Sequence, residues 1–184
     1  SLGESELELP ETTLRTKALY FPVPTDLESQ MRSLGAQTEA DDGSAGRDGS
    51  AGATTDGGAA GGEYAFNGGI HAAEHGAISL FPLSFLCDRG DIGGLSTPYH
   101  PQTEQSTIFI YDGYPGGVGL TKSGYDEIGT LLARTRRMIR DCECTDGCPA
   151  CVQSPHCGNA NDPLSKAEAG MLLDALTDGD DVGA

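Results

Sequence analysis

The segment CECTDGCPAC at positions 142–151 constrains this chain more than any other part of its sequence. Cysteines at such spacings are typical ligands of a structural Zn²⁺, which prefers four tetrahedral ligands and readily takes thiolates. Cys148 and Cys151 have the two-residue spacing of a metal-binding turn, and Gly147 gives the chain room to turn between them and an earlier, closer pair. We therefore predict one closed structural zinc site, with no open position for catalysis and with the ligands Cys142, Cys144, Cys148 and Cys151.

The cysteines leave alternatives open. Cys157 could replace Cys142 as a ligand, and His156 is a weaker substitute. Cys148 and Cys151 could instead be a redox pair or free thiols. The chain shows no N-terminal signal peptide and no apolar run near about 20 residues, so we expect a cytoplasmic protein without membrane contact. In a reducing cytoplasm, clustered cysteines favour a metal site over a disulfide framework.

Hydrophobic periodicity predicts a small α+β domain that is dominated by helices, with the zinc knuckle between the two C-terminal helices. Strands are expected at 14–20 and 107–112. Helices are expected at 25–35, at 69–86 with a kink or restart at Pro82, at 123–140 with Ser123 as cap, and at 165–177 between Ser165 and Gly179. Residues 88–105 and the glycine-rich segment 113–119 are expected to be loops.

Composition divides the chain further. Residues 36–62 consist mainly of Gly, Ala, Ser, Thr and Asp and contain no large apolar side chain, so we expect a disordered insertion there. The zinc-binding domain is expected over 63–178, between an N-terminal strand and helix segment at 1–35 and an acidic tail at 179–184.

The net charge of −17 is spread along the chain. This spread favours adaptation to a halophilic, salt-rich cytoplasm over a single acidic surface for a basic partner. Any DNA contact must then be local, because salt weakens binding to phosphate. Arg136, Arg137 and Arg140 are expected to share a helix face opposite the apolar stripe. That face could contact nucleic acid or a partner protein, or simply pair with nearby carboxylates.

The pentapeptide HAAEH at 71–75 matches the inverted zincin pattern H-x-x-E-H. A stand-alone zinc hydrolase would use His71 and His75 as ligands and Glu74 as base, but it needs a third protein ligand, and the sequence offers no second motif. The apolar flanks favour a structural polar cluster on a buried helix. We expect this cluster to position the following DRGDIGG loop at 88–94.

Two further side chains could serve either structure or binding. Arg89 lies between Asp88 and Asp91 and could fix the loop through a charge network, or contact nucleic acid or a partner. Tyr114 could stack on a base or simply pack. The glycines of 113–119 lack the GK[ST] ending of a phosphate loop and are expected to permit tight turns.

Several motifs occur in one order: HAAEH, LCDRGDIGGLS, TIFIYDGYPGGVGL, CECTDGCPACVQSPHCGN and PLSKAEAGMLL. Together they resemble the C-terminal zinc-binding domain of MrfA-type superfamily 2 DEAD/DEAH-box DNA helicases, over roughly 64–176 and more weakly over 7–35. The resemblance implies a parent ATP-dependent 3′-to-5′ DNA translocase that serves DNA repair. It also implies one structural zinc on the four clustered cysteines and a domain that packs on the motor, joined to it by 1–35.

The motor motifs themselves, a Walker A lysine loop, a DEAD or DEAH box and an arginine finger, are missing from the sequence. We therefore expect a non-catalytic accessory domain. ATP and Mg²⁺ would bind only to the motor domains, and DNA would be reached through the full-length protein. The insertion at 36–62 departs from the family pattern. The alternatives are a stand-alone zinc hydrolase that uses HAAEH and a protein-interaction zinc module without a DNA role.

Overall fold

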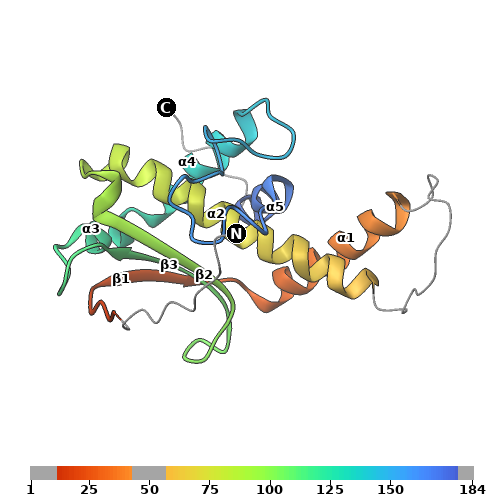
Figure 1. The fold of residues 1–184 in the computed structure, drawn as a ribbon, viewed down its shortest axis with the longest axis horizontal. Helices are drawn as coiled ribbons and strands as arrows, with labels where there is room; N and C mark the ends of the chain where they lie inside the picture. Colours follow the sequence, from red (N-terminus) through yellow and green to blue (C-terminus); the bar gives the residue numbers. More distant parts are fainter. Residues whose placement is uncertain (1–11, 43–56, 178–184) are drawn as a thin grey trace, which may run out of the picture.

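The structure is a computed structural model, and it describes residues 12–42 and 57–177 (Figure 1). Its elements confirm the expected helix-dominated α+β fold. The helices are α1 (Thr25–Asp42), α2 (Gly57–Phe85), α3 (Leu120–Asp126), α4 (Ile128–Asp141) and α5 (Lys166–Leu176), and the strands are β1 (Ala18–Pro22), β2 (Ile92–His100) and β3 (Gln105–Asp112). The cysteine knuckle lies between α4 and α5, as the sequence predicted.

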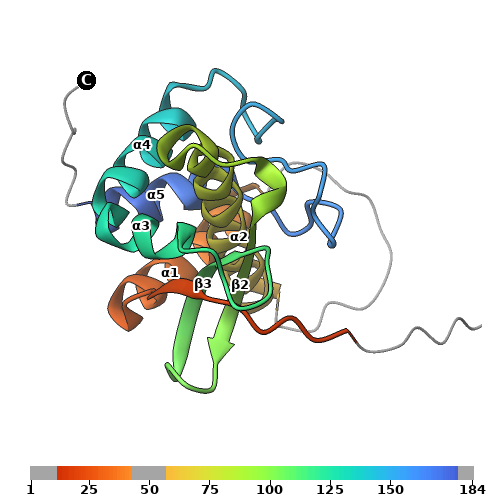
Figure 2. The ribbon, with the colours of Figure 1, turned by 90° about the vertical axis from the view of Figure 1, so that its left-hand side faces the viewer.

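Helix α2 is the centre of the molecule and contacts α1, α4, α5 and β2. The sheet lies on one side of α2, and α4 with the cysteine segment that follows it lies on the other, as both views show (Figures 1 and 2). Phe66, Ile70, Ala73 and Ala77 recur at helical spacing and are buried. Ala72 and Ile78 are buried as well, so α2 is covered on more than one side.

The approach of α2 to α5 depends on a glycine. A Cβ on Gly68 would lie 2.9 Å from the backbone nitrogen of Ser165 and 3.0 Å from the carbonyl carbon of Leu164. Without that Cβ, the Gly68 carbonyl accepts a 3.0 Å hydrogen bond from the Ser165 backbone. The start of α5 is thereby tied directly to the backbone of α2. Ser165 caps α5, as predicted, although its hydroxyl donates to the Glu168 carboxylate rather than to a backbone group.

The three strands form an antiparallel sheet in the order β1-β3-β2. The expectation of a loop over 88–105 is wrong, because β2 occupies half of it and pairs along β3. Gly93 and Gly94 indicated a loop in the sequence. In the fold, a Cβ on Gly94 would lie 2.1 Å from Cδ1 of Ile78, so glycine lets β2 cross α2 without displacing that side chain.

Several helix boundaries also differ from expectation. Helix α2 continues through Pro82 into its final turn, where the missing N–H removes only one hydrogen bond. The helix expected at 123–140 is two helices that meet at Glu127, and Gly119, at φ +96°, is the N-cap of α3 in place of Ser123. Residues 36–42 and 57–62 of the expected disordered insertion are helical, whereas 43–56, Gly179 and the acidic tail lie outside the described residues.

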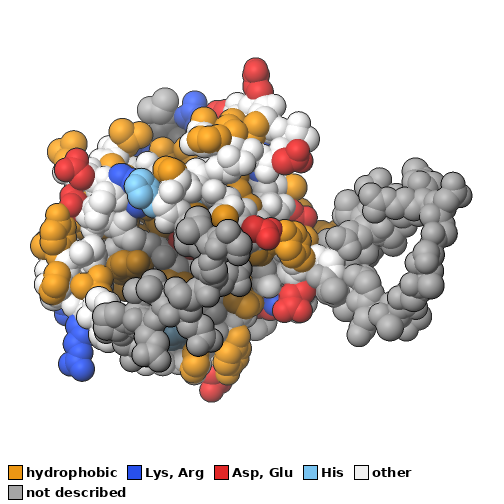
Figure 3. Space-filling model, viewed as in Figure 1, with side chains coloured by type: hydrophobic (Ala, Val, Ile, Leu, Met, Phe, Trp, Pro, Cys, Tyr) orange, Lys and Arg blue, Asp and Glu red, His pale blue; other side chains and the backbone are white. Residues whose placement is uncertain are grey.

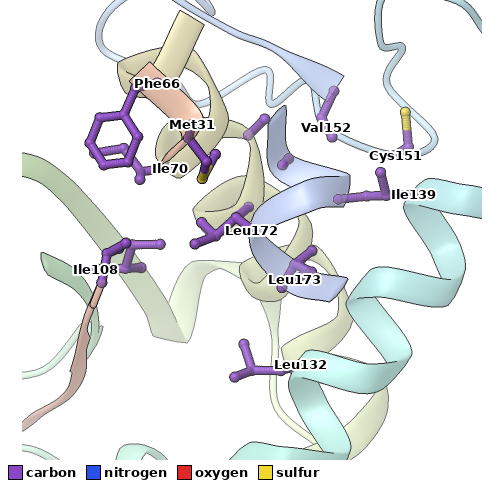
Figure 4. Close-up of a cluster of buried hydrophobic side chains, with 14 residues drawn as sticks. Met31, Phe66, Ile70, Ile108, Leu132, Ile139, Cys151, Val152, Leu172 and Leu173 are labelled. Carbon is purple, nitrogen blue, oxygen red and sulfur yellow. The ribbon is translucent and has the colours of Figure 1, made fainter. Parts of the chain in front are cut away.

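Two groups of buried apolar side chains make up the core. The larger joins α1, α2, α4 and α5 and includes Cys151 and Val152 from the cysteine knuckle (Figure 4). The smaller, around Ile78, Phe81 and Ile110, lies between α2, the sheet and α4. The knuckle is therefore part of the core rather than an appendage. Every helix among the described residues is too short or too polar to cross a bilayer.

Candidate metal centre and the neighbouring cleft

The four clustered cysteines converge on one point. Their sulfur atoms lie 3.6 Å apart for Cys142–Cys144 and Cys142–Cys148, 3.5 Å for Cys144–Cys151 and 3.8 Å for Cys148–Cys151. Zinc–sulfur bonds of about 2.3 Å in a tetrahedron place the sulfurs about 3.8 Å apart, whereas a disulfide brings them to about 2.05 Å. All four cysteines are free. Their spacing fits a tetrahedral thiolate site for one Zn²⁺.

A tight turn presents the second cysteine pair. The backbone N–H groups of Cys151 and Val152 both donate to the carbonyl of Cys148, at 3.0 and 3.1 Å. The N–H of Cys148 in turn points at the sulfur of Cys151, at 3.3 Å. Gly147 precedes this turn at φ +109°, a conformation that favours glycine, as its place in the sequence suggested.

Lys166 anchors the first cysteine pair, and sequence reasoning missed it. Its ammonium donates to the backbone carbonyls of Cys142 and Cys144, each at 2.5 Å. Lys166 is the first residue of α5, where a positive charge opposes the helix dipole. That unfavourable placement was a usable signal, because a cation at a helix N-terminus needs another reason to be there.

The thiols differ in acidity. Burial raises the pKa of Cys151 to about 12. Burial also opposes ionisation of Cys144, but hydrogen bonds from the neighbouring thiols and from the backbone of Gly147 outweigh it and lower that pKa to about 7. Zinc binds thiolates, so zinc binding must release the protons that the cysteine thiols carry in the metal-free protein.

The histidines of HAAEH face the segment that follows the knuckle rather than the loop at 88–94. Nδ1 of His71 lies 2.7 Å from the carbonyl oxygen of Pro163, and Nδ1 of His75 lies 2.8 Å from that of Val152. Nε2 of His71 lies 3.4 Å from the sulfur of Cys157. Cys157 is thus placed beside the histidines, apart from the other four clustered cysteines.

Glu74 lies against the neighbouring strand β2, next to Gly94. Its side chain is buried and lies where a Cβ on Gly94 would collide with it. Burial raises the pKa of Glu74, against the opposing effect of Ser96 and nearby positive charge. Burial lowers the pKa of His75 to about 4, so its ring is neutral at pH 7.

A cleft of about 760 Å³ opens between α2, β2 and the segment after the knuckle. HAAEH contributes His71, Glu74 and His75 to its wall, and Arg89, His156 and Cys157 line it as well. Arg89 is half-buried, its guanidinium donates to the carbonyl of Ile92 at 2.9 Å, and burial lowers its pKa. The polar side chains of HAAEH therefore line an accessible cleft, whereas Ala72 and Ala73 are buried in the core.

Asp91 holds the loop before β2, rather than the charge network around Arg89 that was one of the two roles open to that residue. Asp91 accepts hydrogen bonds from the backbone of Asp88 at 2.8 Å and from the Tyr114 hydroxyl at 2.6 Å. The Tyr114 bond is the main reason why the pKa of Asp91 is lowered and that of Tyr114 is raised. Arg89 turns toward Ile92 and Glu74 instead. The ring of Tyr114 remains exposed.

Asp112 holds the glycine-rich segment and was also missed. Its buried carboxylate accepts N–H bonds from Val118 at 2.6 Å and from Gly119 and Thr121 at 2.8 Å. Burial opposes its ionisation, but these bonds outweigh it and lower the pKa of Asp112. An aspartate at the end of a strand and before several glycines was the available signal. The expectation that the glycines make tight turns fits Gly117 and Gly119, which have positive φ.

The arginine face differs from the expected one. Arg136 is buried and pairs with Asp174 of α5, so it does not lie opposite the apolar stripe. Arg140 shares that carboxylate at 3.2 Å, and Arg137 lies 3.7 Å from Asp141. Only Arg137 and Arg140 of these three keep more than half of their side-chain area exposed. Asp and Glu side chains are scattered over the face shown in Figure 3, in keeping with their spread along the sequence.

Comparison with known proteins identifies a family model and several relatives that are similar to this chain. The model of the MrfA Zn-binding domain family matches residues 73–152. An uncharacterised protein of Methanocaldococcus jannaschii is 36% identical over 110 residues, which cover 58% of this chain and 98% of that protein. The uncharacterised ATP-dependent helicase YprA of Bacillus subtilis is 26% identical over 83% of this chain and 16% of its own length.

A solved structure agrees. The crystal structure of the DUF1998 helicase MrfA bound to DNA superimposes with a TM-score of 0.53 at 26% identity, over 71% of this chain and 16% of that chain. This chain thus spans about a sixth of these two helicases and nearly all of the archaeal protein. With four convergent cysteines inside the matched segment, this chain belongs to the MrfA Zn-binding domain family.

Proposed function

We propose that this chain is a non-catalytic, zinc-stabilised accessory domain of an ATP-dependent 3′-to-5′ DNA helicase that serves DNA repair. The four sulfur atoms at tetrahedral spacing carry the proposal, because four thiolates complete the coordination of Zn²⁺ and leave no position for a substrate. Cys142, Cys144, Cys148 and Cys151 would hold the metal. ATP and Mg²⁺ would belong to the motor domains of the same parent chain.

The zinc would add to the limited core packing of the segment between α4 and α5. Between Asp141 at the end of α4 and Lys166 at the start of α5, the described backbone forms only turns and bends. Cys151 and Val152 are the points at which this stretch enters the core. A metal at the sulfurs would hold the knuckle closed and so keep α4 and α5 in place, since binding energy at such a site is folding energy.

The connection to the motor is proposed to run through 1–35, with 63–178 as the zinc-binding domain proper. β1 pairs with β3, and α1 packs on α2. A movement of this segment would therefore reach the central helix and the sheet directly.

DNA is proposed to be reached mainly through the parent helicase, because the net charge of −17 disfavours phosphate over most of this surface. The candidate local contacts are Arg89 in the cleft, the exposed Tyr114, and Arg137 and Arg140 on α4. The buried Arg136 supports α5 instead. Location in a salt-rich cytoplasm remains a prediction from composition.

Removal of the cysteine pair in the tight turn tests the structural role. The Cys148→Ser/Cys151→Ser variant should lose one zinc per chain, most of its cooperative thermal transition and its sensitivity to chelators, because the knuckle can no longer close. Cys87→Ser changes a free thiol outside the cluster and should retain all three. A double variant that melts like the unmodified chain would refute the structural zinc.

Fluorescence anisotropy with single-stranded DNA at fixed salt tests the contact on α4. Arg137→Ala/Arg140→Ala should weaken binding more than the loss of two charges elsewhere. The control, Lys17→Ala/Lys122→Ala, removes two exposed charges that lie outside α4. Equal losses in the two variants would reject a specific arginine face.

A further inference from the structure

HAAEH and the segment after the knuckle bring a second set of metal-binding side chains together. A ring nitrogen of His71, one of His75 and the sulfur of Cys157 all lie within 4.8 Å of one another. Cys157 is outside the group of four cysteines, and the two histidines come from α2. This set is therefore separate from the site already described.

The backbone orients both rings for metal binding. Nδ1 of His71 and of His75 each lie within hydrogen-bonding distance of a carbonyl oxygen, which can only accept. Each Nδ1 must then carry the proton, and each Nε2 is left with a free lone pair. Histidine ligands of metals are commonly fixed by this kind of N–H to carbonyl bond, which selects the tautomer and holds the ring.

The sulfur of Cys157 is held in place as well. It lies 3.4 Å from Nε2 of His71, close to the roughly 3.6 Å expected between nitrogen and sulfur ligands of one tetrahedral zinc. The backbone N–H of Asn161 points at the sulfur at 3.3 Å. The side chain of Asn161 also bonds the backbone of Ser154 at 2.8 and 3.1 Å, which closes the loop that carries Cys157.

We propose that His71, His75 and Cys157 form a second metal site, which binds Zn²⁺ or a similar transition-metal ion at the wall of the cleft. Two imidazoles and a thiolate suit these metals better than Mg²⁺ or Ca²⁺, which prefer oxygen ligands. Three protein ligands leave the fourth position to a water molecule from the cleft. Glu74 is outside this set of ligand atoms, and its carboxylate lies against Gly94 of β2.

Cobalt titration of the metal-free 184-residue chain counts the sites and distinguishes their ligands. The unmodified chain should bind two equivalents, one with the strong thiolate-to-metal absorption of four sulfurs and one with the weaker absorption of a single sulfur. Cys157→Ala and His71→Ala should each lose only the second equivalent. The matched controls are Cys87→Ser and His156→Ala, which change a cysteine and a histidine outside both sets of ligands. Both should retain two equivalents of cobalt.

Saturation of the unmodified chain at one equivalent overturns the proposal and leaves the contact between His71 and Cys157 as an ordinary hydrogen bond. Two equivalents retained in Cys157→Ala overturn it too. The absorption of the four-sulfur site and the far-ultraviolet circular dichroism show whether each variant is folded. If a variant unfolds, the stoichiometry and absorption of the unmodified chain decide the outcome.

Discussion

Replacement of Asp112 by asparagine should destabilise the domain without removing any apolar contact. The carboxylate accepts three backbone N–H bonds, from Val118, Gly119 and Thr121. An asparagine has one acceptor oxygen, which can keep the bond to Thr121. Its amide N–H₂ group then faces the N–H groups of Val118 and Gly119. Because both sides are hydrogen-bond donors, these two hydrogen bonds are lost.

The expected cost follows from these bonds. A hydrogen bond to a charged group contributes about 1.5–3 kcal/mol, and two such bonds are lost. Val118 and Gly119 are exposed and can bond to water instead, so we expect a net loss of about 2–4 kcal/mol in the free energy of unfolding. For a domain of this size, that corresponds to a drop in Tm of roughly 5–15 °C.

The pH dependence gives an independent check. The pKa of Asp112 is lower in the folded state than its ordinary value, so the unfolded chain binds the proton more tightly. The stabilisation is therefore complete above the unfolded pKa of about 3.9 and is lost as the pH falls through the folded value. The difference in stability between the unmodified chain and Asp112→Asn should narrow below about pH 4.

Urea unfolding followed by circular dichroism, at pH 7 and at pH 3.5, measures both effects. Asp126→Asn is the matched control, because its exposed pair with Lys122 should contribute less than about 0.5 kcal/mol. An Asp112→Asn variant that loses no more than this control at pH 7 would refute the reasoning. So would a difference that persists unchanged at low pH.

Two further predictions concern the contact between α2 and α5 and the support of the cysteine site. Gly68→Ala should destabilise the fold by roughly 1–3 kcal/mol, because its Cβ meets backbone of the segment entering α5. Gly170→Ala, whose Cβ meets no described atom within 4 Å, should stabilise α5 by about 0.5–1 kcal/mol. A Tm that falls in Gly68→Ala and rises in Gly170→Ala supports the close approach of α2 and α5, and a Tm that rises in both variants contradicts it. Lys166→Met should lower zinc affinity about tenfold in a chelator competition, and unchanged affinity would reject its anchoring role.

Features that depend on neighbouring residues could be predicted from the sequence. The four cysteines lie within one short stretch, so their spacing alone predicted a common site, and their sulfurs do converge. Ser165 and the apolar stretch within 105–112 likewise indicated the start of α5 and strand β3. The zinc-binding helicase family could be named because several such local motifs occur in a fixed order.

Features that depend on residues far apart in the chain could not be predicted from the sequence. Gly93 and Gly94 indicate a loop by themselves, and they form a strand only because β3 offers hydrogen bonds and α2 leaves no room for a Cβ. The helical spacing predicted that Arg136 is exposed. In the structure its guanidinium pairs with the carboxylate of Asp174 on α5 and is buried. In both cases a long-range contact outweighs the local preference.

HAAEH shows the same division. The sequence by itself determined that His71, Glu74 and His75 share one helix, because their spacing follows the helical turn. Only the tertiary structure decided that Glu74 faces β2 while the histidines face Cys157. The reason is that helical periodicity orders side chains around one axis, whereas their partners come from segments that the sequence does not place beside that helix.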